Sequence, residues 1–462
     1  MYSETMRYFK HALLGIAQAS IILALFGCSK LPDADAIPPG PLMAESIRFQ
    51  FAIYYLPRYS SDPSPLLNKI ISQKYDKFNI INEIKTPTNG QYVYAHLLNN
   101  VKAKYAPPDI TSLKYFGRGL TQAQAQAVQK SEQAYILNFG YPRSEVWSGL
   151  RAAYEIAESV ARETGGLLWD EQTRELYTPD EWHKKRIASW QEAIPAISDH
   201  TTIHAYNAGE YVRAITLGMS KFGLPDVVID DFSWSMNRSM GHLINLFCQA
   251  IAEGATITKH GEFDLDIRSI KNTKIRDSQI ESLKPNATAL ALLSAKYGKA
   301  EEGDPDNRLI SLAFSRYPGK DAHASQEKLL SSLFGWEDEV TYVKHNEELI
   351  AASNRAKALL PALQKAFTAG LAPGEFIQVK APFAVPAGGQ EWMWVEITSW
   401  QQDKIKGLLK NEPFNIPSLH GGQIVEIRQQ DIFDYIRRYP DGKEEGNETG
   451  TIIQKMQLEK SR

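Results

Sequence analysis

The chain contains only two cysteines, Cys28 and Cys248, so at most one disulfide bond can contribute to its stability. Its 462 residues, 43% of them hydrophobic, are enough for two or three domains that each bury a core. The formal net charge of -3 provides no basic field, and nucleic acid is therefore not expected as a partner. The fold must rest mainly on hydrophobic cores.

The N-terminus has the pattern of a cleaved secretion signal over residues 1–27. Arg7 and Lys10 precede an apolar run from Ala12 to Phe26. This run is shorter than the roughly 20 apolar residues that a membrane-spanning helix needs. It also ends without the positive residues of a stop-transfer segment, which favours cleavage over permanent insertion.

The end of this run, Leu25-Phe26-Gly27-Cys28, resembles the lipobox of bacterial lipoproteins. The resemblance implies that Cys28 carries a diacylglycerol and a palmitate, and that the protein is anchored to membrane lipid. Ser29 then implies the outer membrane, on its periplasmic face, if the bacterium has two membranes. The alternative is an ordinary leader in which Cys28 is buried or disulfide-bonded. Residues 28–46 are polar and rich in proline, which predicts an extended tether.

Residues 47–343 are expected to form a mixed sheet-and-helix domain of the α/β or α+β class, because strand and helix patterns alternate along them. A long helix is predicted over residues 144–163. Residues 255–343 are either the end of this domain or a connector, with a helix expected over residues 286–297.

Two histidines, His200 and His204, have the spacing of a zinc protease pair on a helix, but Thr201, Thr202 and Ile203 favour a strand. On a strand their side chains are too far apart to share one ion, and no metal site is expected. We interpret both as partly buried sheet histidines and keep them as candidate ligand-binding residues.

The helix predicted over residues 235–253 has two stripes. Its core stripe is flanked by Cys248, which we interpret as an inert core thiol rather than a nucleophile. The second stripe is polar and consists of Arg238, His242, Asn245 and Gln249.

The block from residue 164 to residue 255 resembles uncharacterised bacterial α/β domains. The resemblance is carried by "GGLLWDEQTRELYTPDEW", "TIHAYNAGEYVRAITLGMSKFGLPDVVIDDF" and "SMGHLINL". It implies one compact domain and no particular reaction.

Residues 344–440 contain a helix, "EELIAASNRAKALLPALQKAF", followed by "GEFIQVKAPF", "EWMWVEITSW", "IKGLLKNEP" and "GGQIVEIRQQDIFDYI". In order and spacing these segments resemble the YegJ-like family, domain of unknown function 2314. The short strands predict a small antiparallel, SH3-like barrel with a leading helix. Residues 441–462 are expected to be a polar tail.

The segment "EWMWVEITSW" places Trp392, Trp394 and Trp400 on one face of the predicted strand. Such an aromatic face is a candidate platform for a sugar or a peptide. The alternative is that the tryptophans lie under the leading helix and belong to the core.

The most probable function from these patterns is a membrane-anchored envelope lipoprotein that binds an envelope protein or a cell-wall component, such as peptidoglycan, without catalysis. The alternatives are an envelope hydrolase using His200, His204 and nearby acids, or an immunity or defence protein. No catalytic motif is found, so the catalytic residues are unknown and enzymatic activity is left open but not favoured. No cofactor is expected.

Overall fold

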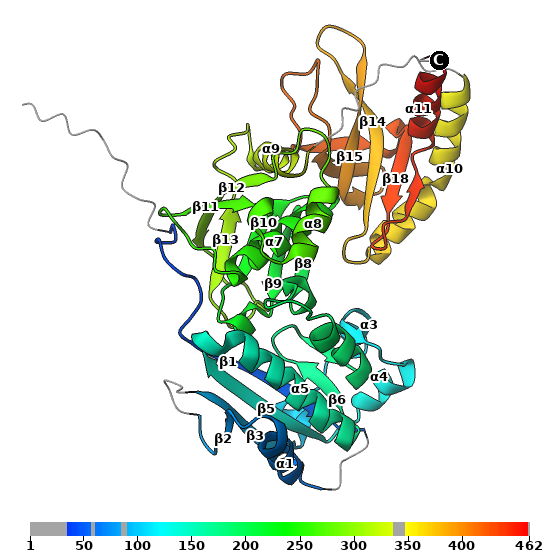
Figure 1. Cartoon of the computed structure of the whole chain (residues 1–462). Helices are drawn as coiled ribbons and strands as arrows, with labels where there is room; N and C mark the ends of the chain where they lie inside the picture. The colour runs from blue at the N-terminus through cyan, green and yellow to red at the C-terminus, as the bar shows by residue number, and fades with distance from the viewer. Residues whose placement is uncertain (1–34, 57–60, 85–89, 336–346, 461–462) are drawn as a thin grey trace, which may run out of the picture. The chain divides into compact units, whose positions relative to one another are not determined.

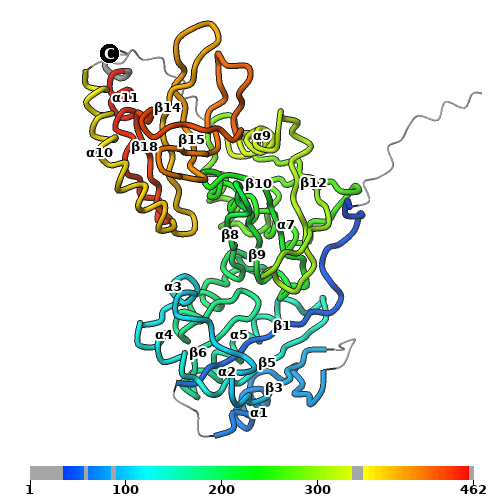
Figure 2. The backbone as a smooth tube through the Cα atoms, turned by 180° about the vertical axis from the view of Figure 1, so that it is seen from behind, coloured from blue at the N-terminus to red at the C-terminus, as the bar shows by residue number. Residues whose placement is uncertain are grey.

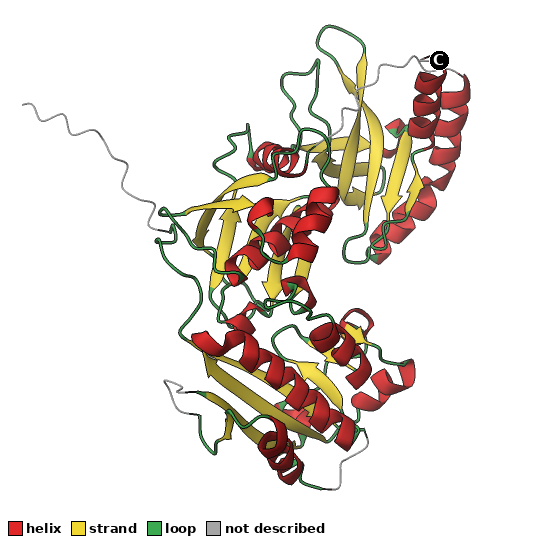
Figure 3. Cartoon of the chain, viewed as in Figure 1, coloured by secondary structure: helices red, strands yellow, loops and turns green. Residues whose placement is uncertain are grey.

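The computed structural model describes residues 35–56, 61–84, 90–335 and 347–460. The strands of these residues form three sheets, and helices pack against each of them (Figures 1 and 3). The mixed sheet-and-helix region and the C-terminal antiparallel sheet predicted from the sequence are confirmed. Two of the three sheets fall within residues 47–343.

The first sheet has seven strands, and its central strand β1 pairs antiparallel with both β5 and β6. Every second residue of β1 from Ile47 to Ile53 is isoleucine or phenylalanine and joins one buried cluster, while Ala52 and Tyr54 on the other face join a second cluster. In spatial order the strands are β2 (Phe78–Ile80), β3 (Gln91–Asn99), β5 (Gln133–Pro142), β1 (Ser46–Tyr54), β6 (Leu167–Asp170), β7 (Glu175–Tyr177) and β4 (Gly117–Arg118).

Helices cover both faces of this sheet. Phe49, Phe51 and Ile53 of β1 belong to the same buried cluster as the apolar face of α5 (Val146–Thr164), which α1 (Ser64–Lys74) also joins. Figure 2 traces the chain from behind, where α2 lies on the side away from α5. That second face is covered by α2 (Val101–Lys104), α3 (Ser112–Phe116) and α4 (Gln122–Val128).

The second sheet has six strands, and all neighbouring pairs are antiparallel except β10 with β13. Its buried residues continue the cluster of the first sheet, so residues 35–334 share one main core. In spatial order the strands are β11 (Glu262–Asp266), β12 (Leu290–Tyr297), β13 (Leu309–Ala313), β10 (Asp226–Phe232), β9 (Tyr211–Leu217) and β8 (Thr202–Ala208); the helices are α7 (Asn237–Ala252), α8 (Thr273–Glu281) and α9 (Ala322–Phe334).

The helix expected over residues 286–297 is wrong, because most of this segment is strand β12. Ala291, Leu293 and Ala295 are buried at a spacing of two residues, which is the period of a strand. Pairing with β11 on one side and β13 on the other overrides the helical preference of alanine and leucine.

The beginning of the described chain packs against the second sheet. The Ile37 N–H donates to the Ala295 carbonyl at 3.1 Å, and the Gly40 N–H donates to the Ile257 carbonyl at 3.0 Å. Ile37 and Leu42 are buried. The structure differs here from the extended tether expected through residue 46, because these two apolar side chains gain more by joining the core than by staying in water.

The third sheet is antiparallel throughout and follows a long helix, α10 (Glu347–Ala369). Ala356, Leu360 and Leu363 of α10 share a buried cluster with the strands. Residues 441–462, expected to be a polar tail, contain a strand and a helix. The elements are β17 (Ile424–Arg428), β16 (Lys404–Leu409), β15 (Gln390–Gln401), β14 (Phe376–Ala384), β18 (Asp434–Arg438) and β19 (Glu444–Gly446) in spatial order, followed in the chain by α11 (Glu448–Lys460).

The three tryptophans of β15 do not share a face. Between Ile397 and Ser399 the pairing with β16 shifts by one residue, which is a β-bulge. The extra residue reverses the alternation, and Trp400 therefore joins the core on the same side as Ile397. The expectation that Trp400 lies beside Trp392 and Trp394 is wrong for this reason. Trp392 instead packs against Phe433, with ring centroids 4.7 Å apart.

Replacing Trp400 with alanine is expected to lower the free energy of unfolding of this region by about 3–5 kcal/mol, because it empties a large buried volume. Trp394 is half-buried, with the Lys380 Nζ 5.6 Å from its ring centroid, and its replacement should cost on the order of 1 kcal/mol. Urea denaturation followed by circular dichroism measures both variants. Equal losses would contradict the assignment of the two side chains to different faces.

Candidate functional site

A cavity of about 440 Å³ lies between three segments of residues 189–279. One wall is the stretch from Ser189 to Asp199, which ends in the short helix η3 (Ile197–Asp199). The second wall is the polar face of α7, and the third is one side of α8 together with Asn272 just before it. We call this cavity the α7 pocket.

The α7 wall is the polar stripe that the sequence predicts. The core stripe of α7, which includes Leu243, Ile244 and Phe247, is fully buried. On the other side, His242, Asn245 and Gln249 line the pocket. Arg238, the first residue of the predicted stripe, is outside the lining.

Gln249 joins the α7 wall to the wall formed by residues 189–199. Its Oε1 accepts the Ile197 N–H at 2.9 Å, and its Nε2 donates to the Pro195 carbonyl at 3.2 Å and to the Glu253 carboxylate at 2.8 Å. The side chain is 1% exposed. Since the Gln249 amide makes all these hydrogen bonds to protein groups, it holds the pocket walls in place and is not a ligand-binding group.

The α8 wall is held in a similar way. The Asn272 Oδ1 caps α8 by accepting the Ile275 N–H at 3.1 Å, and its Nδ2 donates to the Ile194 carbonyl at 3.2 Å. The Glu192 carboxylate accepts the Thr273 N–H at 3.2 Å and its hydroxyl at 2.9 Å. The three walls are therefore connected by hydrogen bonds before any ligand arrives.

Other polar groups in the pocket are free to bind. Within the described residues, the Asn245 amide makes no hydrogen bond, and the Gln279 Oε1 is enclosed without a donor. Burial, and next the charge of Arg238, lowers the pKa of His242, so its ring is neutral at pH 7. The pocket can therefore both donate and accept hydrogen bonds.

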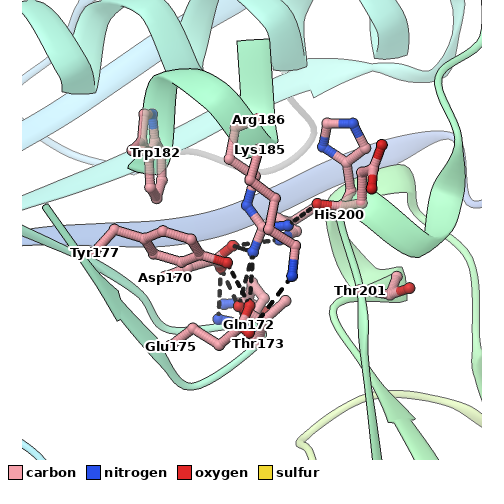
Figure 4. Close-up of polar contacts among 12 residues, drawn as sticks. Asp170, Gln172, Thr173, Glu175, Tyr177, Trp182, Lys185, Arg186, His200 and Thr201 are labelled. Atoms are coloured by element: carbon pink, nitrogen blue, oxygen red, sulfur yellow. Dashed lines mark hydrogen bonds and ion pairs between the residues drawn. The ribbon is translucent and has the colours of Figure 1, made fainter. Parts of the chain in front are cut away.

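A buried ionic network lies behind the wall that ends at Asp199. Figure 4 shows Asp170 and Glu175 turned toward Arg186. The Arg186 Nη2 contacts the two carboxylates at 3.0 and 3.1 Å, and its Nη1 donates to the Asp199 carbonyl. Lys221 pairs with Asp170, and the side chains of all four charged residues, Asp170, Glu175, Arg186 and Lys221, are 0% exposed.

The charges of this network are balanced by their neighbours. Burial alone would raise the pKa of Glu175, but the positive charges of Arg186 and Lys185 lower it to about 2. Burial lowers the pKa of Lys221 to about 8, although Asp170 opposes this shift. Because Arg186 lies between the β6–β7 hairpin and the Asp199 carbonyl, the network supports the pocket wall from behind.

The structure does not bring the two candidate histidines together. His200 is completely buried, stacked on Tyr154 with ring centroids 5.4 Å apart, and burial lowers its pKa well below the ordinary value. His204 instead packs against Phe116, with the two rings tilted and their centroids 4.7 Å apart, and burial, followed by the charge of Arg174, lowers its pKa to about 4. Neither histidine lines the α7 pocket.

The two cysteines lie in different parts of the chain. Cys28 lies outside the described residues. Cys248 is buried as a free thiol, and burial raises its pKa, as expected for an inert core cysteine. In the described part of the chain, no three His, Cys, Asp or Glu residues are grouped as a metal ion requires, and no helix is long and apolar enough to cross a membrane.

Residues 346–460 match the family model DUF2314, described as an uncharacterized protein conserved in bacteria. The C-terminal region is a DUF2314 domain. This match confirms the resemblance inferred from the sequence, and it extends through β19 and α11. Neither a search of the curated proteins nor a search of the solved structures found a match. The α7 pocket, formed by residues 189–279, lies outside the DUF2314 domain.

Sequence reasoning missed two of the three pocket walls. Nothing in residues 189–199 or 272–279 marks them as partners, because they are far apart in the sequence and meet only in the fold. The available signal was the polar stripe on α7: a helix with a buried core face and uncharged amides beside it is typical of a second, specific surface.

Proposed function

We propose that this protein is a lipid-anchored lipoprotein of the bacterial envelope that binds a small polar ligand, such as a fragment of the cell wall, without transforming it. The observation that carries this proposal is the α7 pocket, in which, among the described residues, the Gln279 Oε1 is enclosed without a donor and the half-buried Asn245 amide makes no hydrogen bond, between walls that are already fixed. The anchor is supported by the lipobox-like segment ending at Cys28.

The chemistry of the pocket suits recognition. Its volume lies within the roughly 300–1,000 Å³ of typical small-molecule sites. Asn245 offers both a donor and an acceptor, and the neutral His242 ring does the same. Because Gln249 and Asn272 fix the walls, little conformational entropy is lost when a ligand binds.

The test is calorimetric titration of the full chain, purified in detergent, with soluble fragments released enzymatically from the bacterium's own cell wall. Asn245→Ala is expected to weaken binding about 10-fold, which corresponds to the loss of about one hydrogen bond. The control is Glu281→Gln, an exposed residue at the end of α8 that does not line the pocket. If the Asn245 variant and the wild type bound the cell-wall fragments with equal affinity, the α7 pocket would not be the binding site.

A further inference from the structure

We propose that the ligand of the α7 pocket is a zwitterion, namely an amino acid or a short peptide with a free ammonium group and a free carboxylate. Asp199 would bind the ammonium group and Lys274 the carboxylate. This inference rests on the proposed function, because it names the ligand class of the same pocket.

The argument begins with the charges that line the pocket. Four ionisable side chains are present: Glu192, Asp199, His242 and Lys274. The Glu192 carboxylate is occupied by the first residues of α8, and His242 is neutral. Among the described residues, the Asp199 carboxylate and the Lys274 ammonium are the charged groups of the lining that have no hydrogen-bond or ion-pair partner.

These two groups have no ion-pair partner among the described residues. Asp199 uses its backbone carbonyl to accept Arg186, which leaves its carboxylate available. The Asp199 charge also acts weakly on the pKa of Lys185, but the Lys185 Nζ is paired with the Glu175 carboxylate at 3.7 Å. Lys274 lies in the first turn of α8 with an exposed side chain.

The uncharged side chains of the pocket, Asn245 and Gln279, can form the hydrogen bonds that a peptide needs. The enclosed Gln279 Oε1 requires an N–H or O–H donor, and a peptide N–H supplies one. Asn245 can bind the N–H and the C=O of a second amide. A neutral sugar could satisfy these amides but would form no ion pair with Asp199 or Lys274, so the presence of both charges in the lining favours a zwitterion.

The two charges also lie on different walls. Asp199 belongs to the end of η3, and Lys274 belongs to the first turn of α8. In this proposal the two ends of the ligand, which carry opposite charges, contact these two side chains. The arrangement therefore distinguishes a free peptide from one blocked at either end, since each block removes one charge pair.

Titration of the full chain in detergent with four probes tests this inference. The probes are the dipeptide Ala-Ala, its N-acetyl derivative, its C-terminal amide and N-acetylglucosamine. We expect the free dipeptide to bind at least 10-fold more tightly than either blocked form. In Asp199→Asn the penalty for N-acetylation should disappear, and in Lys274→Gln the penalty for amidation should disappear. Lys274 is exposed, so its variant keeps the test valid if Asp199→Asn fails to fold.

Each other outcome overturns the inference in a recognisable way. Equal binding of free and blocked dipeptides, or binding of the sugar alone, excludes the zwitterion and leaves the pocket proposal intact. If cell-wall fragments bind in a way that depends on Asn245 but no dipeptide binds, the zwitterion is again excluded and the pocket proposal stands. If neither the fragments nor the probes bind, both proposals fail.

Discussion

Replacing Arg186 with methionine is expected to lower the free energy of unfolding by about 3–5 kcal/mol, the cost typical of removing one partner from a buried ion pair. Methionine keeps much of the volume but not the charge. Among the described residues, the Asp170 carboxylate would keep only Lys221 as a cationic partner, and the Asp199 carbonyl would lose the hydrogen bond from Arg186. Urea denaturation followed by circular dichroism measures the change.

Arg162→Met provides the matched control for this experiment. Arg162 also contacts two carboxylates, those of Glu158 and Asp180, but its side chain is 44% exposed. Since water already solvates this group, its loss should cost less than about 1 kcal/mol. If the Arg162 and Arg186 variants lost equal free energy of unfolding, burial would not explain the contribution of the Arg186 network to stability.

The pocket wall should respond to the same replacement. Because Arg186 contacts the Asp199 carbonyl, we expect Arg186→Met to weaken ligand binding in addition to lowering stability. Binding is measured at a temperature where the variant is folded, so that the two effects are separated.

Replacing Cys28 with alanine is expected to abolish the incorporation of labelled palmitate and to release the protein from the membrane fraction. The reason is that the lipobox-like segment offers one acceptor thiol for the acyl chains, and stable anchoring requires more than one chain. Metabolic labelling in the native bacterium, followed by fractionation, measures both effects.

Cys248→Ala is the control for the lipidation experiment. Cys248 is a fully buried residue of α7, and its thiol is therefore inaccessible to an acyltransferase. This variant should keep the full label. A wild-type protein without label would instead make residues 1–28 an ordinary leader or anchor, and the envelope proposal would lose its main support.

The sequence predicts most accurately the elements whose pattern is local. The helix expected over residues 144–163 corresponds to α5 (Val146–Thr164), which Gly165 ends in a left-handed conformation with a φ of 71°. The hairpin of β8 and β9 is also a local structure, since its turn passes through Gly209, whose φ of 67° is left-handed. In each case the side chains that decide the structure lie within a few residues of one another.

The candidate site was only partly predictable. Asn245 and Gln249 were identified as part of a polar stripe, since their spacing is helical. The Trp400 position was predicted wrongly because a bulge depends on the partner strand, and β12 was predicted as a helix because its pairing with β11 and β13 is not visible locally.

By itself, the sequence determined the periodic elements, the lack of disulfide support beyond one possible bond, and the C-terminal DUF2314 domain. Only the tertiary structure decided which segments face one another. It placed Asp199 and Lys274 in the same pocket as Asn245, and it enclosed Arg186 with Asp170 behind the wall. The physical reason is that these contacts join residues tens of positions apart, and their free energy depends on burial and hydrogen bonding that exist only once the chain has folded.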